Sequence, residues 1–316
     1  MKRNLFENNI IITAGSTYLD IDAYACIVAM AELVNLKGGN AVAYSCAPRN
    51  YSVVESLVTE GEIKASLPAG FNREADGYIV VDVSDPEFLK SSVPLDRVVE
   101  IYDHHVGFEE YWQKCIGIGA NIEFIGAAAT LIYREWKRVG LQNKMKRSTA
   151  LLLIAAILDN TLNLTSSNTS REDIAVFNTL CEYAGVSENF CSSYFSEVQK
   201  SVEADLRNAL LGDVKNIRDN PVLPSCMGQV AVWNSDSLLE RTEEISQWFN
   251  SLYDSWMLNI IDVQCKCNYF MCNSSEHQKK IEQIFEVSFE SGIAKTPVSY
   301  LRKEIIKKTV RFGSDF

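Results

Sequence analysis

Three consecutive residues, Asp103-His104-His105, carry two of the chain's three histidines directly after a carboxylate. They end the apolar run 97–102, which predicts a buried strand. Because neighbouring side chains on an extended segment point to opposite faces, Asp103 and His105 could aim at one point, with His104 aimed elsewhere or brought round by the turn that follows. Open α/β sheets bind ligands at the carboxyl ends of their strands, so the triplet is a candidate ligand site. Taken alone, it could equally be an ordinary polar strand end.

Further aspartates follow other predicted strands. Asp20 and Asp22 come after the apolar run 10–15, and Asp82 and Asp85 end the nearly all-apolar run 77–85. In a parallel sheet these strand ends lie along one edge, where clustered carboxylates would repel one another strongly. Divalent cations would relieve that repulsion, which is the physical reason to predict a metal site. Capping of the next helix by Asp22 is the simpler alternative, but capping does not require Asp20 as well.

Strands and helices alternate along the first half of the chain. Strands are predicted at 10–15, 41–46, 77–85 and 97–102, and helices at 23–36 and 51–59. Nearly continuous apolar strands are typical of parallel sheets that are covered on both faces. We therefore predict an α/β fold built on a parallel sheet with helices on both faces.

Two later segments could contribute to the same site. Residues 126–130 are small and open a helix, where bare backbone N–H groups suit an anion or simply permit close packing. Asp159 follows the strongly apolar helix 148–158, as a satisfied helix-end group or as a further ligand. Asp85 is better explained as a solvated strand end.

Length and composition limit the classes of function. The chain has 316 residues, enough for two domains, and its net charge of −11 argues against a nucleic-acid duplex as partner. Nine cysteines and the lack of any run of membrane-helix length predict a cytoplasmic protein with reduced thiols and no membrane partner. Neither a P-loop nor a Gly-x-Gly-x-x-Gly motif occurs, which argues against the usual nucleotide cofactors.

The order of these motifs resembles that of the DHH phosphoesterase superfamily. The matching elements are Asp20-x-Asp22, Asp82, Asp103-His104-His105, Gly126-x-x-x-Thr130 and Asp159-Asn160-Thr161. The stretch 158–164 is similar to the branch of manganese-dependent inorganic pyrophosphatases and exopolyphosphatases, and Ala47-Pro48-Arg49 is similar to the exopolyphosphatase side. Five spaced motifs seldom agree by chance. This resemblance implies a parallel-sheet DHH domain followed by a smaller α/β DHH-associated domain.

The resemblance also implies a role for each site residue. Two divalent cations, Mn²⁺ or Mg²⁺, would activate a water molecule that attacks phosphorus. The implied metal ligands are Asp20 for the first ion, Asp22, His104 and Asp159 for the second, and Asp82 for both. His105 would act on the phosphate or the leaving group, and Asp103 would orient it.

Ser16 is a departure from the pyrophosphatase pattern. Those enzymes carry a histidine four residues before the first aspartate, where this chain has Ser16, and the exopolyphosphatase branch has asparagine there. A hydroxyl is a weak ligand, so the first site becomes dominated by oxygen atoms and should tolerate magnesium or manganese.

The second half of the chain changes character after a helical stretch. We expect a DHH metal-binding domain over 1–190, a helical linker over 191–211 and a DHH-associated domain over 212–316. By resemblance, the residues that would grip the electronegative substrate are Lys215, Arg302 and Lys303, with Arg49 from the first domain. The substrate is expected in a cleft between the domains, and a homodimer is possible.

These inferences predict a metal-dependent phosphohydrolase that cleaves phosphoanhydride bonds in pyrophosphate or short polyphosphate. One alternative is a phosphodiesterase on small nucleotides, which would share the metal site. Another alternative is a weakly active or inactive relative that acts as a binding protein, in which Ser16 in place of the histidine marks the loss of activity. Retention of the five aspartates and both histidines argues against loss, because idle clustered carboxylates would only destabilise the sheet edge.

Overall fold

The computed structural model describes residues 9–15, 18–74, 76–217 and 220–313. The chain forms two compact units. The first comprises the described residues up to Leu164 together with Asn168–Glu188, and the second comprises Thr165–Ser167 and the described residues from Asn189 onward. Ser16 lies outside the described residues.

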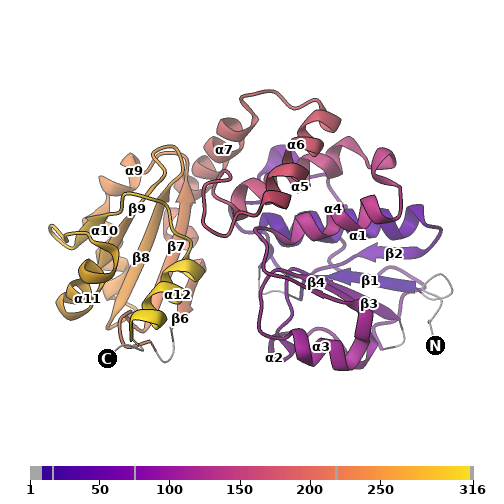
Figure 1. Cartoon of the computed structure of the whole chain (residues 1–316), viewed down its shortest axis with the longest axis horizontal. Coiled ribbons are helices and arrows are strands. Elements are labelled where there is room, and N and C mark those ends of the chain that lie inside the picture. Colours follow the sequence, from indigo (N-terminus) through magenta and orange to yellow (C-terminus); the bar gives the residue numbers. More distant parts are fainter. Residues whose placement is uncertain (1–8, 16–17, 75, 218–219, 314–316) are drawn as a thin grey trace. The chain divides into compact units, whose positions relative to one another are not determined.

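The first unit contains a five-stranded parallel sheet (Figure 1). Its strands are β1 (Asn9–Thr13), β2 (Asn40–Ala43), β3 (Gly77–Val81), β4 (Val98–Asp103) and β5 (Ala120–Ile122), in the order β2-β1-β3-β4-β5. The central strands are buried along most of their length, which is why their sequences are nearly all apolar. The predicted fold class is confirmed.

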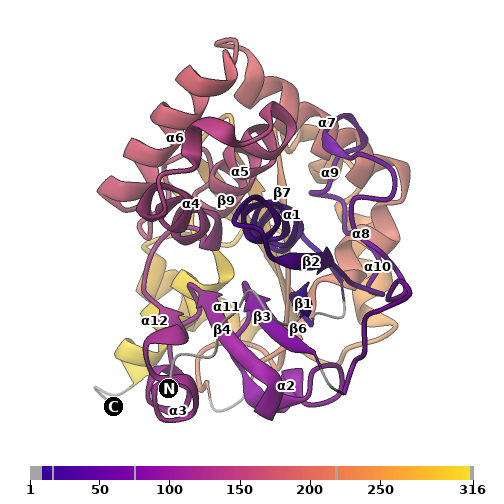
Figure 2. The ribbon, with the colours of Figure 1, turned by 90° about the vertical axis from the view of Figure 1, so that its right-hand side faces the viewer.

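Helices cover both faces of this sheet (Figures 1 and 2). On one face lie α1 (Ile21–Leu36), α4 (Ala128–Arg138), α5 (Arg147–Asn160) and α6 (Arg171–Ala184); on the other lie α2 (Pro86–Leu89) and α3 (Glu109–Ile116). Helices α1 and α5 pack against each other and are buried on nearly all sides, so neither has a polar face.

The predicted helix over 51–59 is wrong. The segment is irregular apart from one 3₁₀ turn at Glu55–Leu57. Ser52 uses its hydroxyl to accept the backbone N–H of Ile21 at 2.9 Å, and Val53 and Val54 are buried in the core. Tertiary contacts of these side chains therefore override the local helical preference.

The second unit is built on a mixed five-stranded sheet. It contains α7 (Phe190–Ala204), α8 (Leu206–Gly212), β6 (Val214–Asn216), β7 (Cys226–Val232), α9 (Asp236–Leu239), α10 (Thr242–Asn250), β8 (Trp256–Asp262), β9 (Cys267–Cys272), α11 (Ser275–Phe285), β10 (Ile293–Lys295) and α12 (Arg302–Gly313). The strand order is β10-β9-β8-β7-β6. Among the described strands of this sheet, β7 and β8 pair in parallel, and the other neighbouring strands pair antiparallel. Helices α7 and α8 contact β7 and belong to this unit. Along the described residues, no helix combines the length and apolar character that crossing a bilayer needs.

Candidate metal centre

Two neighbouring strand ends bring a carboxylate and two imidazoles together. Asp82 directly follows β3, and its backbone N–H donates to the Tyr102 carbonyl of β4 at 2.8 Å. Its backbone has φ of 57°, a left-handed conformation that is strained for a residue with a side chain. Ligand atoms of Asp82, His104 and His105 all lie within 4.8 Å of one another. The strand-end triplet therefore meets the aspartate of the adjacent strand.

The ring of His104 is held in one orientation. Its Nδ1 lies 2.9 Å from the Gly126 carbonyl oxygen and 3.2 Å from that of Ile125. Carbonyl oxygens only accept, so Nδ1 carries the proton and donates. The opposite nitrogen, Nε2, then faces Asp82 Oδ1 at 3.4 Å.

This pair of facing atoms suits a cation. The side chains of His104 and Asp82 are only 1% and 6% exposed, so two electron-rich atoms face each other away from water. Such a contact costs free energy unless a proton or a metal ion lies between them. Imidazole with its second nitrogen bonded to a carbonyl is the usual arrangement of a metal-ligating histidine. The donor set thus fits a divalent metal ion.

His105 is oriented by Asp103. Its Nδ1 lies 2.8 Å from Asp103 Oδ1, and its backbone N–H donates to the same oxygen at 3.0 Å. Asp103 is wholly buried, whereas the His105 side chain is 54% exposed. The exposed ring therefore has a fixed direction and a second nitrogen, Nε2, that can exchange a proton with a bound molecule.

Asp22 is a buried residue of α1, and its carboxylate contacts the first residues of α4. Its two carboxylate oxygens accept the backbone N–H groups of Ala128 and Ala129 at 2.8 and 2.9 Å. Burial raises the pKa of Asp22 to about 7, with a further rise from Asp20, against the opposing effect of these two hydrogen bonds. The small-residue helix start does bind an anion, and that anion is the chain's own carboxylate.

Cys26 is a buried thiol whose surroundings include three aspartates. Its wholly buried thiol donates to Asp22 Oδ1 at 3.4 Å. Burial raises the pKa of this thiol, and the charges of Asp22, Asp82 and Asp20 raise it further. Asp20 itself is half-buried and caps α1 by accepting the Ala23 N–H at 2.9 Å. These three carboxylates therefore lie near enough to Cys26 for their charges to raise its pKa.

Asp173 is a buried residue of the site that the motifs did not indicate. Its Oδ2 accepts the N–H groups of Gly126 and Ser170 at 2.9 and 2.7 Å, and its Oδ1 accepts the Thr130 hydroxyl at 2.6 Å. The carbonyl of Gly126 holds His104, so Asp173 positions His104 through this residue. The detectable sequence feature was the capping box Ser170-x-x-Asp173 at the start of α6.

The remaining residues of the first unit have simpler surroundings. Asp159 is half-buried in the last turn of α5. Arg49 pairs with Glu55 at 3.0 Å and lies beside Leu19 in an isolated bridge, next to the loop that carries Asp20. Asp85 caps α2 by accepting the Glu87 N–H at 2.9 Å.

The three predicted substrate-binding residues of the second unit differ in exposure. Lys215 is exposed on β6, and Lys303 is half-buried in the first turn of α12. Arg302 is buried, and its Nη2 lies 2.6 Å from Asp213 Oδ1.

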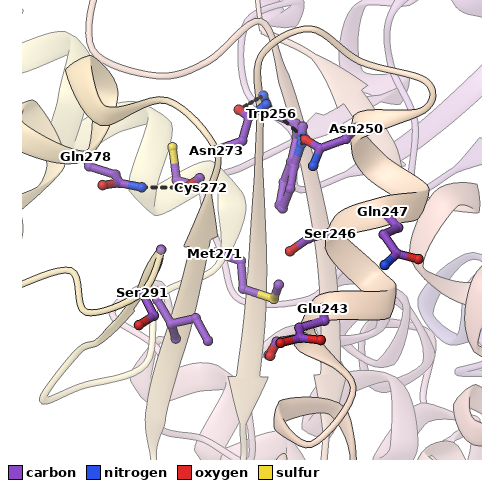
Figure 3. Close-up of a pocket in the computed structure, with 13 residues that line it drawn as sticks. Glu243, Ser246, Gln247, Asn250, Trp256, Met271, Cys272, Asn273, Gln278 and Ser291 are labelled. Atoms are coloured by element: carbon purple, nitrogen blue, oxygen red, sulfur yellow. Dashed lines mark hydrogen bonds between the residues drawn. The ribbon is translucent and has the colours of Figure 1, made fainter.

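The second unit also contains a cavity of about 480 Å³ beside α10, β9 and β10 (Figure 3). Neutral side chains such as Gln247, Asn250 and Gln278 line it, together with Glu243. The side-chain oxygen of Asn250 already accepts a hydrogen bond from the Trp256 indole N–H at 2.8 Å. No lysine or arginine is among the described residues that line this cavity, so it does not suit a phosphate anion.

Comparisons with known proteins agree with the motifs. No family model matches the chain. A probable manganese-dependent inorganic pyrophosphatase of Staphylococcus carnosus is 24% identical over 314 residues, covering 92% of this chain and 96% of that protein. A second one, of Bacillus mycoides, is 26% identical over 199 residues, covering 60% of each chain.

Solved structures share the fold. A structure from Methanococcus jannaschii, assigned provisionally to the family II inorganic pyrophosphatases, superposes with a TM-score of 0.65 at 20% identity, covering 96% of this chain and 98% of that one. An exopolyphosphatase-related protein from Bacteroides fragilis gives 0.52 at 11% identity, covering 98% and 92%. The resemblance predicted from the motifs is confirmed.

Proposed function

We propose that this chain, a relative of the manganese-dependent inorganic pyrophosphatases, is a hydrolase that cleaves phosphoanhydride bonds in pyrophosphate or short polyphosphate. The observation that carries the proposal is the buried contact between His104 Nε2 and Asp82 Oδ1 at 3.4 Å, with the other imidazole nitrogen committed to the Gly126 carbonyl. This contact is a prepared cation site at the carboxyl ends of two parallel strands.

The chain's own carboxylates and imidazole would hold two divalent ions. The proposed ligands are Asp20, Asp22, Asp82, His104 and Asp159. When bound, the ions would supply an activated water and offset the negative charge of the phosphate groups. To bind a metal ion, Asp22 would have to lose its proton and share its oxygens with the N–H groups at the start of α4. Its affinity for a metal ion should therefore decrease as the pH is lowered through about 7.

His105 is the proposed proton donor to the leaving phosphate. Asp103 holds its Nδ1, so the proton transferred would be the one at Nε2. The exposure of the ring gives a substrate access to that nitrogen. Lys215, Lys303 and Arg49 are the proposed sources of positive charge for the substrate. The nine free cysteines support the expectation of a reducing compartment.

Phosphate release tests the proposal directly. Wild-type protein is incubated with Mn²⁺ or Mg²⁺ and pyrophosphate, tripolyphosphate or a cyclic nucleotide, beside Asp82→Ala and the matched variant Asp85→Ala. We expect release from the two anhydrides, loss of it in Asp82→Ala, and wild-type rates in Asp85→Ala, because Asp85 only caps α2. Turnover of the cyclic nucleotide alone would replace this proposal with a phosphodiesterase. No turnover of any substrate by the wild type would end it.

A further inference from the structure

Three neighbouring strands of the second unit carry amide side chains on one face of the sheet. Gln229 of β7 is directly paired with Asn259 of β8, and Asn268 lies on β9. Asn259 and Asn268 are wholly buried. Asn259 Nδ2 donates to Gln229 Oε1 at 3.2 Å, and Asn268 Nδ2 donates to Asn259 Oδ1. We call Gln229, Asn259 and Asn268 the amide row.

The amide row holds the segment that leads into α12. Asn268 and Asn259 both donate to the Tyr300 carbonyl, at 2.7 and 3.0 Å. The Tyr300 N–H in turn donates to Asn268 Oδ1 at 3.0 Å, and the Arg302 N–H donates to Gln229 Oε1 at 2.5 Å. Buried amides are retained only where their partners are satisfied, and such a network fixes one arrangement of the chain. The backbone from Tyr300 to Arg302 is therefore fixed to the sheet.

The side chain of Arg302 is committed to the protein. Besides the ion pair with Asp213, its Nη1 donates to the Asp213 carbonyl at 2.7 Å and to the Met227 carbonyl at 3.3 Å. The side chain is 9% exposed. A guanidinium that is buried and bonded to three protein oxygens has little capacity left for a phosphate.

This ion pair joins two segments that each carry a lysine, exposed Lys215 and half-buried Lys303. Asp213 precedes Lys215 by two residues, and Arg302 directly precedes Lys303. Fixing Arg302 on Asp213 therefore fixes the start of α12 against the start of β6. The separation of the two lysine backbones is set by this buried contact and by the amide row.

We propose that Arg302 is a positioning residue, which together with Asp213 and the amide row holds Lys215 and Lys303 at a set spacing for an anionic substrate. This inference rests on the proposed function. It assigns Arg302 a role through Asp213, in place of the direct substrate contact expected from the sequence. A compact polyanion such as pyrophosphate needs its cations at a defined spacing, because a displaced lysine loses both hydrogen bond and charge.

Asp213→Asn separates the two roles of Arg302. If Arg302 only positions, weakening its partner lets β6 and α12 shift, so KM for pyrophosphate rises about tenfold or more while kcat changes less. If Arg302 binds phosphate, Asp213→Asn frees the guanidinium, and KM stays unchanged or falls. The matched control is Lys307→Gln, which removes one positive charge from the same helix and should leave KM within about twofold, as expected for weak surface charges.

A stability measurement keeps the two proposals distinguishable. A urea double-mutant cycle over Asp213→Asn and Arg302→Gln reports the coupling of the pair whether or not the protein is active. Strong coupling with a raised KM in Asp213→Asn supports the inference. Absent coupling, or an unchanged KM in an active, folded Asp213→Asn, overturns it. If the wild type is inactive but the coupling is intact, the proposed function is refuted. The role in spacing the lysines for a substrate is then refuted with it, and the Asp213–Arg302 pair only stabilises the fold.

Discussion

Replacing Gly126 by alanine should damage the fold and the metal centre together. A Cβ atom at this position would lie 2.6 Å from Asp173 Oδ2, 2.8 Å from Asp173 Cγ and 2.7 Å from Thr161 Cγ2. The Asp173 carboxylate cannot move away freely, because it also accepts hydrogen bonds from Ser170 and Thr130. The backbone at residue 126 must shift instead.

The magnitude follows from the contacts that are lost. Overpacking a dense core costs about 1–3 kcal/mol. Losing a hydrogen bond to a charged group, here Gly126 N–H to Asp173, costs about 1.5–3 kcal/mol more. We therefore expect about 3–5 kcal/mol of destabilisation, which for a unit of this size lowers Tm by roughly 10 °C. The displaced carbonyl also releases His104, so metal affinity should fall roughly 10- to 100-fold.

Thermal unfolding without metal and calorimetric titration with Mn²⁺ measure the two effects. Gly212→Ala is the matched control, since a Cβ there meets nothing within 4 Å and the residue ends helix α8. It should leave Tm and metal affinity near those of the wild type. If Gly126→Ala kept its Tm, the packing around Asp173 would be looser than described. If it lost stability but bound Mn²⁺ as tightly as the wild type, the Gly126 carbonyl would not control His104.

Two further predictions concern the same unit. Asp82→Gly should be about 1 kcal/mol more stable than Asp82→Ala, measured by urea unfolding without metal. Both variants lack the carboxylate, and only alanine keeps the backbone strain at φ of 57°. Equal stabilities would contradict that strain. Burial raises the pKa of Glu100, although a hydrogen bond from Tyr102 at 2.9 Å opposes the rise. The folded state then holds this proton more tightly than the unfolded state, so its stabilising effect is present at low pH and is lost as pH rises through the folded pKa. Glu100→Gln should therefore gain stability relative to the wild type as pH rises above the ordinary glutamate range, measured by urea unfolding across pH 4–8, and a constant difference would refute the shift.

The fold could be predicted because its information is local. Each central strand of the first sheet is a short β-branched run, and α5 has apolar residues all round, which only burial on every side explains. The break between two consecutive helices is harder to predict from the sequence. The chain forms two short helices in succession, α9 and α10, with a break at Glu240 and Arg241 that no glycine or proline marks.

Long-range pairing limited what could be predicted of the site. The strand-end positions of Asp82 and Asp103 follow from sequence, since each directly ends an apolar run. The partners of Asp22 do not, because the N–H groups of Ala128 and Ala129 lie 106 and 107 residues away along the chain. The burial of Arg302 against Asp213 across 89 residues is likewise a property of the folded sheet that no local pattern encodes.

Helix α1 uses two acidic side chains to hold two other helices at their amino ends. Asp22 serves α4, and Glu32 accepts the Lys146 N–H at 2.8 Å and the Thr149 hydroxyl at the start of α5. A relative that had abandoned catalysis would still be under selection to keep Asp22, because its loss would leave two N–H groups buried without acceptors. His105, whose side chain is 54% exposed and accepts no buried N–H group, would be less constrained by the fold. Among diverged homologues, His105 should therefore report retained activity better than Asp22 does.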